Sequence, residues 1–501
     1  MKTARHGGHR DRLECGMDNP LLKDFELPPF AAIRPEHAEP ALRSVIGRHR
    51  ARLAEIEVQA NPSFANVAEP MEAMQHELSR TWSPISHLNG VVNSEALRDA
   101  YNACLPLISD YQTDVGQSES LYHAYHAVEK REGHQLDTAQ HRVVTNALRD
   151  FHLAGVALPI ERKTRFKAIM AELATLGAKF EENVLDATND WKLHVTDGSR
   201  LAGLNDGLLA AAALRAREAG VDGWLMTLDQ PTYVAVITDC ESRELRHAYY
   251  EAWTTRASDQ GPSKGRWDNT LVIEQILKLR HEAAQMLDFP NYAQYALSTR
   301  MARSLHEVTD FLQQLAVAAR PAAQREYAEL QSFAGQPLEA WDLAFYGERL
   351  QRSRFSVSQE ELRPWFALPR VIEGLFDVAQ RLFDVRIHER LGVPSWHADV
   401  RFYVIENASG ETVGSFYLDA YARPNKRSGA WMDECVGRKD IDKPAKPVAY
   451  LVCNVLPPTA DQPALLTHDD VVTLFHEFGH GLHHMLTRVG YPSIAGINGV
   501  A

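Results

Sequence analysis

Apolar residues recur every three or four positions along most of the chain, which predicts a mainly α-helical protein. The clearest case is residues 161–185, where Phe166, Ile169, Leu173, Leu176, Phe180 and Val184 fall on one helical face. The same spacing and the helix-start signals predict six further helices. Their expected ranges are 36–59, 70–81, 137–151, 242–253, 269–287 and 305–333.

Short apolar runs rich in β-branched and aromatic residues interrupt the helical pattern near the C-terminal end. Residues 401–406 and 412–418 flank the turn sequence Asn407-Ala408-Ser409-Gly410, which predicts a β-hairpin, and residues 447–453 predict a third strand. An exposed edge strand can bind an extended peptide through main-chain hydrogen bonds. Ala449, Tyr450 and Leu451 are therefore candidate substrate contacts, and a purely structural sheet is an equally good interpretation.

Two shorter segments leave more than one interpretation open. Residues 223–237 predict either two short strands around Asp229-Gln230-Pro231 or a loop leading into a helix. The basic segment 423–429, RPNKRSG, is favoured as a solvated loop, with contact to peptide carboxylates as the alternative.

Composition narrows the class of protein. The net charge of −13 argues against nucleic acid as a partner, and no run approaches the roughly 18 apolar residues that span a membrane. Residues 1–16 are polar and basic without an apolar core, so we expect a disordered extension and not a secretory signal, with Met17 as a possible true start. The five scattered cysteines indicate reduced thiols and a cytoplasmic location.

The most informative segment is THDDVVTLFHEFGHGLHHM, residues 467–485. Thr467 is a plausible N-cap with Asp470 as its capping-box partner, and Asp469 and Asp470 suit the positive end of the helix dipole. Because positions i and i+4 share a helix face, His476 and His480 can meet one metal ion. This is the H-E-x-x-H pattern of zinc peptidases.

The pattern assigns a role to each residue. His476 and His480 are predicted ligands of one Zn²⁺ ion, and Glu477 is the predicted general base that takes a proton from a metal-bound water. The alternative is an ordinary helix with exposed histidines. His483 could share the zinc-facing side of the helix, but His483 and His484 do not match a longer three-histidine pattern. They are predicted to lie behind the metal ligands or at the rim of the site. Gly479 and Gly481 indicate either a close substrate or backbone, or tight helix packing.

Several stretches carry a specific family resemblance: NPLLKDFELPPF, TTRASDQGP, GSFYLDAYARPNKRSGAWMDECVG, KPVAYLVCN and FHEFGHGLHHMLT. Over essentially all of residues 17–501 the chain resembles the M3 (thimet oligopeptidase-like) metallopeptidases. The resemblance implies a mainly α, two-lobed, gluzincin-like molecule with a small β-sheet beside the zinc helix and a deep channel between the lobes. It implies an N-terminal helical domain over 17–190 and a catalytic region over 191–501, acting as a monomer on short unfolded peptides.

One departure from the family pattern changes the expected activity. The resemblance implies a third zinc ligand, a glutamate on the helix after the H-E-x-x-H helix, and no Glu or Asp follows His480 here. We therefore expect a chain truncated at its C-terminus, weaker zinc binding and impaired turnover. The alternatives are a non-catalytic peptide-binding form of the same fold and a helical scaffold with an accidental motif.

Overall fold

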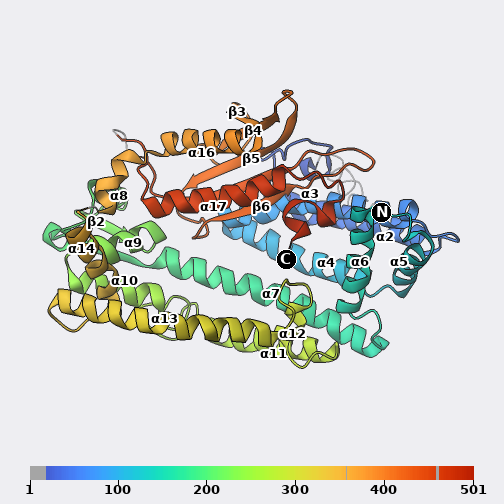
Figure 1. The fold of residues 1–501 in the computed structure, drawn as a ribbon, viewed down its shortest axis with the longest axis horizontal. Helices are drawn as coiled ribbons and strands as arrows, with labels where there is room; N and C mark the ends of the chain where they lie inside the picture. Colours follow the sequence, from blue (N-terminus) through green and yellow to red (C-terminus); the bar gives the residue numbers. More distant parts are fainter. Residues whose placement is uncertain (1–18, 357, 459–461, 501) are drawn as a thin grey trace, which may run out of the picture.

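The structure is a computed structural model that describes residues 19–356, 358–458 and 462–500. It is mostly helical with a small β-sheet, as predicted (Figure 1). Among the described helices, none is long and apolar enough to cross a membrane. The predicted extension over residues 1–16 and the alternative start at Met17 lie outside the described residues.

Six long helices form the N-terminal part of the chain. They are α2 (Ala38–Glu57), α3 (Glu69–Val91), α4 (Glu95–Gly116), α5 (Glu119–Glu132), α6 (Thr138–Leu153) and α7 (Ile160–Asp190). Ser94, Ser118 and Asp137 cap α4, α5 and α6 by accepting a hydrogen bond from a backbone N–H of the first turn. Because each cap is a contact within the first turn, local sequence alone determines where these helices begin.

The helix predicted for residues 70–81 is longer than expected, because α3 continues to Val91 with Pro84 inside it. Proline removes one backbone hydrogen bond and normally ends or kinks a helix. Here Ile85, Leu88 and Val91 lie in the largest hydrophobic core, and their burial offsets that loss. Tertiary packing decides this helix end.

The middle of the chain is a second set of helices. They are α8 (Asp206–Glu218), α9 (Gln230–Asp239), α10 (Arg243–Thr254), α11 (Thr270–Met286), α12 (Tyr292–Leu297), α13 (Leu305–Ala334), α14 (Leu343–Phe355), α15 (Gln359–Leu362) and α16 (Leu368–Phe383). Of the two interpretations of residues 223–237, neither is complete: the structure has one strand followed by a helix. Strand β2 (Trp224–Thr227) pairs antiparallel with β1 (Lys192–Val195), and α9 follows it.

The main sheet has five strands in the order β3-β4-β5-β7-β6. They are β3 (Val385–Glu389), β4 (Arg401–Asn407), β5 (Thr412–Tyr421), β6 (Trp431–Val436) and β7 (Val448–Val455). The predicted hairpin is confirmed as the antiparallel pair β4–β5, whereas β5 and β7 are parallel. The predicted strand over 447–453 is confirmed as β7.

Alternate residues of β7 enter two different cores. Tyr450 and Val452 join a core shared with the N-terminal helices, whereas Ala449 and Leu451 join one shared with α16 and α17 (His468–Met485). The N-terminal helices and the sheet thus share one hydrophobic core, and the predicted domain boundary at residue 190 stays a prediction. Figure 1 shows α16 and α17 beside the sheet.

The substrate-contact hypothesis for Ala449, Tyr450 and Leu451 is wrong in this structure. Strand β7 is an interior strand between β5 and β6, so both sides of its backbone are already paired. The three residues are at most 1% exposed. The sequence of a buried interior strand is a nearly continuous apolar run. That pattern does not show whether the backbone edge of the strand is paired or open to a peptide.

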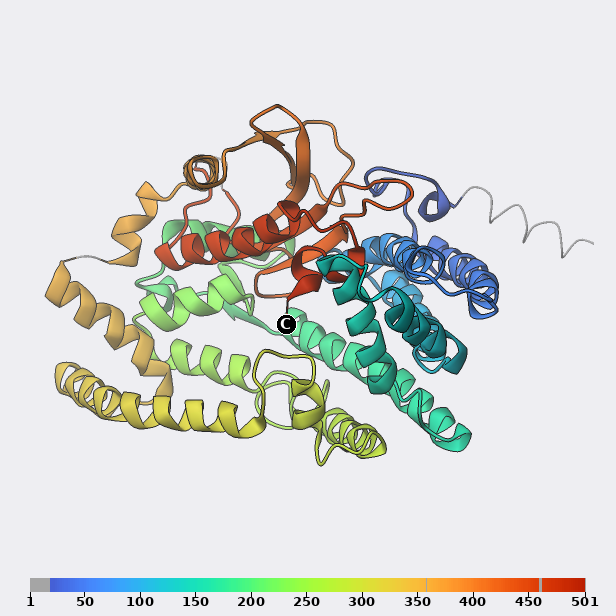
Figure 2. The same ribbon diagram turned by 45° about the vertical axis from the view of Figure 1, so that its right-hand side comes forward.

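The long helix α13 has no buried residue and lies on the side of the molecule opposite the sheet (Figures 1 and 2). Phe311, Leu312 and Leu315 on this helix are more than half exposed. The sequence of α13 has the amphipathic pattern of a helix that packs on one face. The pattern therefore predicts the helix correctly, but it does not predict whether the apolar face is buried.

Candidate active site

Helix α17 begins where the sequence predicts. The Asp470 N–H donates to Thr467 Oγ1 over 3.0 Å, and the Thr467 N–H donates to Asp470 Oδ2 over 2.8 Å. This capping box satisfies two backbone donors that the first turn would leave without partners. The helix that carries the H-E-x-x-H pattern therefore has a defined start.

One face of α17 is buried against the sheet and the other is open. Leu474, Phe478, Leu482 and Met485 join the core that contains β5, β7 and α16. His476 and His480, together with Val472 and Phe475, are exposed on the opposite side. Burial of the apolar stripe thus orients the two imidazoles away from the core.

The two predicted ligands converge. The Nε2 atoms of His476 and His480 are 3.2 Å apart, and the rings are nearly perpendicular at 87°. Two nitrogen ligands at about 2.0–2.1 Å from a tetrahedral zinc ion would be about 3.3 Å apart. The chemistry and the spacing of these two donors therefore fit one Zn²⁺ ion.

The described residues place no third ligand at the site. Within the described parts of the chain, no group of three or more His, Cys, Asp or Glu side chains is arranged to hold a metal ion. Glu477 is half-buried beside His476, where helix geometry rotates it by about 100° from that ligand. The site thus contains two convergent imidazoles and a neighbouring carboxylate.

The buried thiol of Cys453 is not a competing ligand. Burial raises the pKa of Cys453 on β7 to about 12, and the Glu477 and Asp470 carboxylates add to the rise against the opposing effect of Lys426. A thiol with such a pKa stays protonated at neutral pH, and protonated thiols bind zinc poorly.

The predicted rim position is wrong for His484. His483 is exposed, and its place at the rim of the site stays a prediction. His484 is fully buried, and its Nε2–H donates to the Val436 carbonyl over 3.1 Å. Burial lowers the pKa of His484. This histidine holds the C-terminal end of α17 against β6.

The two glycines of α17 have different surroundings. A Cβ on Gly481 would lie 2.9 Å from Leu451 Cδ2 on β7, whereas a Cβ on Gly479 would meet nothing within 4 Å. Tight packing therefore explains Gly481, and the close-substrate hypothesis remains open for Gly479 alone.

This difference predicts opposite effects of alanine at the two positions. Gly479→Ala is expected to raise the free energy of unfolding by about 0.5–1 kcal/mol, because alanine favours the helix. Gly481→Ala is expected to lower it by about 1–2 kcal/mol, because the overpacking of Leu451 exceeds the same helical gain. Urea unfolding of both variants measures this. Equal stabilisation by the two substitutions would contradict the packing explanation.

The basic loop 423–429 is not the solvated loop that its sequence favours. Asp419 on β5 is 1% exposed, and its carboxylate accepts hydrogen bonds from Arg423 over 2.6 Å and Lys426 over 2.8 Å. The Lys426 ammonium also donates to the carbonyls of Tyr421 and Cys453. The loop is therefore fixed to the strands that pack against α17.

Sequence reasoning missed this network, although one signal was present. Asp419 interrupts the apolar strand sequence FYLDAY, and a lone carboxylate in such a strand requires a buried partner. Arg423 also donates to the Val91 carbonyl at the end of α3, and the Arg427 N–H donates to the Gly90 carbonyl. The loop connects the N-terminal helices to the sheet beside the site.

Fold and site together define a class of protein. A mostly helical chain that presents His-Glu-x-x-His on the open face of a helix, beside a small sheet, is a metallopeptidase of the H-E-x-x-H type.

Comparison with known proteins narrows the class to one family. Residues 236–500 match the model of peptidase family M3, and residues 42–163 match the neurolysin/thimet oligopeptidase N-terminal domain. The chain belongs to peptidase family M3, which confirms the resemblance drawn from its sequence.

Similar proteins include several bacterial peptidases. Oligopeptidase A of Escherichia coli K12 is 48% identical over 97% of this chain and 72% of its own length. Oligopeptidase A of Haemophilus influenzae is 45% identical over the same shares. Dipeptidyl carboxypeptidase of E. coli K12 is 32% identical over 96% of this chain and 72% of its own.

A solved structure of PZ peptidase A with an inhibitor is similar in fold. Its TM-score is 0.50 at 14% identity, covering 91% of this chain and 64% of that one. At this identity the likeness concerns the fold alone.

Proposed function

We propose that this protein is a zinc-dependent endopeptidase that hydrolyses short peptides, with His476 and His480 as metal ligands and Glu477 as general base. The observation that carries the proposal is the 3.2 Å separation of the two Nε2 atoms on the open face of α17, with Glu477 beside them. Membership of peptidase family M3 supports the reaction type.

The residues of the site have separate tasks. Neutral His476 and His480 would each offer an Nε2 lone pair to the ion, which requires the proton of each ring to be on Nδ1. A zinc ion bound there supplies Lewis acidity, which lowers the pKa of a bound water to about 7. Glu477 accepts the proton of the attacking water and returns it to the amine that leaves when the peptide bond breaks.

The number of metal ligands limits the zinc affinity that we expect of this chain. Its described residues offer two imidazoles and no third group, so zinc would be held more weakly than at a three-ligand site. The same observation favours a second candidate function, a non-catalytic form of the fold that binds peptides without cleaving them.

The substrate class, location and assembly are proposals of the same kind. Short unfolded peptides, reaching the site through a channel between two lobes, are the substrates that the family resemblance implies. The relatives named oligopeptidase A support this substrate class, although this chain spans 72% of their length. A cytoplasmic monomer is the state that we propose, with neither nucleic acid nor a membrane as a partner.

Metal binding tests the proposal without requiring turnover. Titration of the 501-residue chain with Co²⁺ should give the visible absorption of a low-symmetry site at one ion per chain, which Zn²⁺ then displaces. His476→Ala and His480→Ala should each weaken binding by more than about 100-fold, because each removes a direct ligand and even indirect partners cost 10–100-fold. His468→Ala, at an exposed histidine eight residues before His476 on the same helix, is the matched control.

Two results would contradict the ligand assignment. One is full metal occupancy in either ligand variant. The other is a loss in His468→Ala as large as in the ligand variants, which would indicate non-specific binding by surface histidines. Cleavage of a quenched fluorescent peptide by the metal-loaded protein then separates the endopeptidase from the peptide-binding form.

A further inference from the structure

Arg256 follows helix α10, and its half-buried guanidinium group is fixed by three contacts. Its Cζ atom lies 3.5 Å from the centroid of the Trp253 ring, and its Nε–H donates to the Trp253 carbonyl over 3.0 Å. Its Nη1–H donates to Thr188 Oγ1 on α7 over 3.2 Å. Trp253 also stacks on Tyr233 of α9, with ring centroids 4.4 Å apart. The group is therefore oriented before a ligand binds, which lowers the cost of binding.

Among the described residues, no carboxylate pairs with Arg256. Glu251 and Asp259, the acidic residues nearest to it in sequence, form no ion pair with it, and the titratable group that acts on its charge is the Tyr233 phenol. Burial raises the pKa of that phenol, so it is uncharged at neutral pH. The positive charge is partly withdrawn from water without a counterion, and burial accordingly lowers the pKa of Arg256.

The carboxylates at the C-terminal end of α7 already have partners. Asp186 binds Arg98 over 2.8 Å, and Asp190 binds Arg266 over 2.8 Å. Arg266 also lies over an indole ring, at 4.3 Å from the centroid of Trp267. An arginine stacked on a tryptophan can therefore have a carboxylate partner in this region of the molecule.

Arg256 has hydrogen-bond donors to spare. A guanidinium group has five N–H donors, and this one uses two of them within the described residues. The Nη2 atom makes no hydrogen bond to a described residue and is not enclosed by protein, so it reaches solvent. One N–H of Nη1 and both of Nη2 remain for a ligand. A planar guanidinium group binds both oxygens of one carboxylate through two parallel hydrogen bonds.

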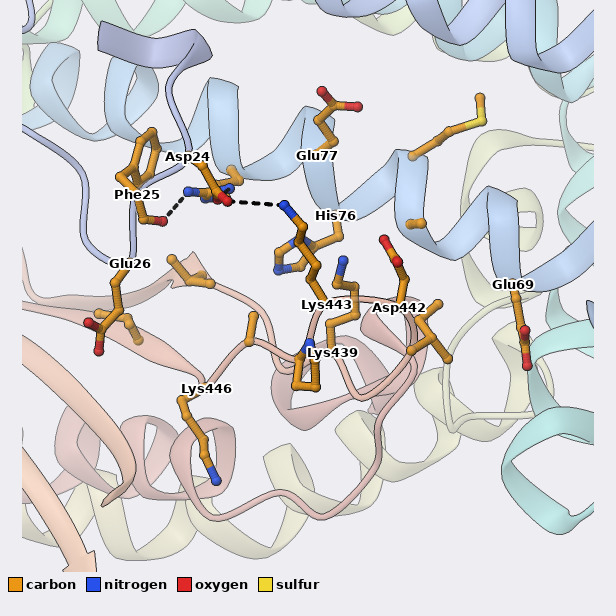
Figure 3. Close-up of a pocket in the computed structure, with 18 of the residues that line it drawn as sticks. Asp24, Phe25, Glu26, Glu69, His76, Glu77, Lys439, Asp442, Lys443 and Lys446 are labelled. Atoms are coloured by element: carbon orange, nitrogen blue, oxygen red, sulfur yellow. Dashed lines mark hydrogen bonds and ion pairs between the residues drawn. The ribbon is translucent and has the colours of Figure 1, made fainter. Parts of the chain in front are cut away.

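A cavity of about 1030 Å³ between α3, the segment 24–27 and the loop 437–446 offers no comparable site. Cations and carboxylates both line it, and Figure 3 shows Asp24 paired with Lys443. Because both signs of charge are present, the cavity does not select an anion. In the described part of the chain, Arg256 differs because no carboxylate offsets it.

The Arg256 group is connected to the candidate active site by packing. Trp253 and Tyr233 pack on the hydrophobic core that contains α8, α9 and α10, and Leu456 packs on the same core. Leu456 follows β7 on the segment that leads to α17. Figures 1 and 2 show α9 and α10 beneath α17, on the side away from β3 and β4. The Arg256 surface and the segment that leads into α17 therefore share one core.

We propose that Arg256 binds a carboxylate group of the peptide substrate, with the Trp253 ring supporting the plane of the guanidinium group. The carboxylate is the C-terminal one or that of an acidic side chain, and both present the same pair of oxygens. The inference rests on the proposed function, because it takes a short peptide as the ligand. It concerns binding, and it requires neither metal nor turnover.

The test is equilibrium binding of short peptides to the metal-free 501-residue chain, measured by fluorescence anisotropy with a chelator present. Three peptides carry an uncharged N-terminal dye and otherwise neutral side chains. One has a free C-terminal carboxylate, one is its C-terminal amide, and one is the amide with an internal aspartate. At least one carboxylate peptide should bind about tenfold more tightly than the neutral amide, because hydrogen bonds between ionised groups are the strong ones. The tighter peptide identifies the source of the carboxylate.

Two variants and a control make the test specific. Arg256→Gln should remove this preference and leave the affinity for the neutral amide unchanged, since only a carboxylate peptide loses a charged partner. Arg256→Lys should keep a preference of about threefold, because lysine retains the charge but lacks the planar fork. Arg266→Gln is the matched control and should keep the full preference, because Asp190 already pairs with Arg266 over the Trp267 ring.

Three results would overturn the inference. The first is equal binding, or no binding, of all three peptides by the parent chain, which requires no variant to fold. The second is a carboxylate preference that persists in Arg256→Gln. The third is an equal loss of affinity for all three peptides in that variant, because Arg256 would then be a structural residue. The Co²⁺ titration judges the zinc site separately, so the failure of one proposal is distinguishable from the failure of the other.

Discussion

Asp419→Ala is expected to lower the free energy of unfolding by about 3–5 kcal/mol, because it leaves two buried cations without their counterion. Lys426 is 5% exposed, and the Arg423 side chain is 13% exposed. The Asp419 carboxylate accepts from both cations and from the Trp396 indole N–H over 2.8 Å. Urea unfolding followed by far-UV circular dichroism measures the change.

The same ion cluster predicts a pH dependence. Burial would raise the pKa of the Asp419 carboxyl, but Arg423 and Lys426 outweigh it and lower the pKa to about 2. The folded-state pKa is below the ordinary value of about 3.9, so this stabilisation is present above pH 4 and is lost as the pH falls toward 2. The stability difference between the parent and Asp419→Ala should therefore shrink by about 2–3 kcal/mol over that interval.

A matched control is Glu39→Ala in the exposed Glu39–Arg43 pair of α2, which should change stability by less than about 1 kcal/mol. A change in Asp419→Ala no larger than in this control would show that the buried cluster contributes little. A stability difference that does not depend on pH between 4 and 2 would contradict the depressed pKa of Asp419.

Glu477→Gln is expected to lower kcat for peptide cleavage by about 10²–10⁴-fold while leaving metal affinity unchanged. Glutamine keeps the size of the side chain but accepts no proton at neutral pH. Glu477 is half-buried on α17 and is adjacent in sequence to the ligand His476, so the substitution tests proton transfer and not metal binding. The measurement pairs the cleavage rate of a quenched fluorescent peptide with the Co²⁺ titration on the same preparation.

The control for this variant is Glu406→Gln, which makes the same chemical change at a partly exposed position of β4. It should retain the parent rate. If Glu477→Gln kept a near-normal kcat, the general-base role would be wrong. If Glu477→Gln also lost the metal, the role of Glu477 would be to position the metal ligands and not to accept a proton from the water.

Much of the fold can be predicted from short-range patterns in the sequence. Two features can be predicted because each depends on residues within a few positions. They are the capping box of Thr467 and Asp470 and the 3.6-residue periodicity of α7. The hairpin β4–β5 was readable for the same reason, since a short turn separates its strands. The ligand pair of His476 and His480 also belongs here, because the i, i+4 spacing already places both on one helix face.

Other features depend on partners far away in the sequence. The position of β7 between β5 and β6 makes Ala449, Tyr450 and Leu451 core residues, and no local pattern distinguishes a central strand from an edge strand of this composition. The continuation of α3 through Pro84 requires the core around Ile85 and Leu88.

The sequence by itself determined the helical class, the zinc-binding pattern and the family, because these reside in short motifs and in periodicity. Tertiary structure alone decided which charges are buried. Lys426 and Lys443 both lie in polar loops, yet the Lys426 ammonium is buried against a carboxylate and three carbonyls, whereas the Lys443 side chain is 79% exposed. Burial and pairing of a charge are set by the chain segments that surround it in space, and those segments come from distant parts of the sequence.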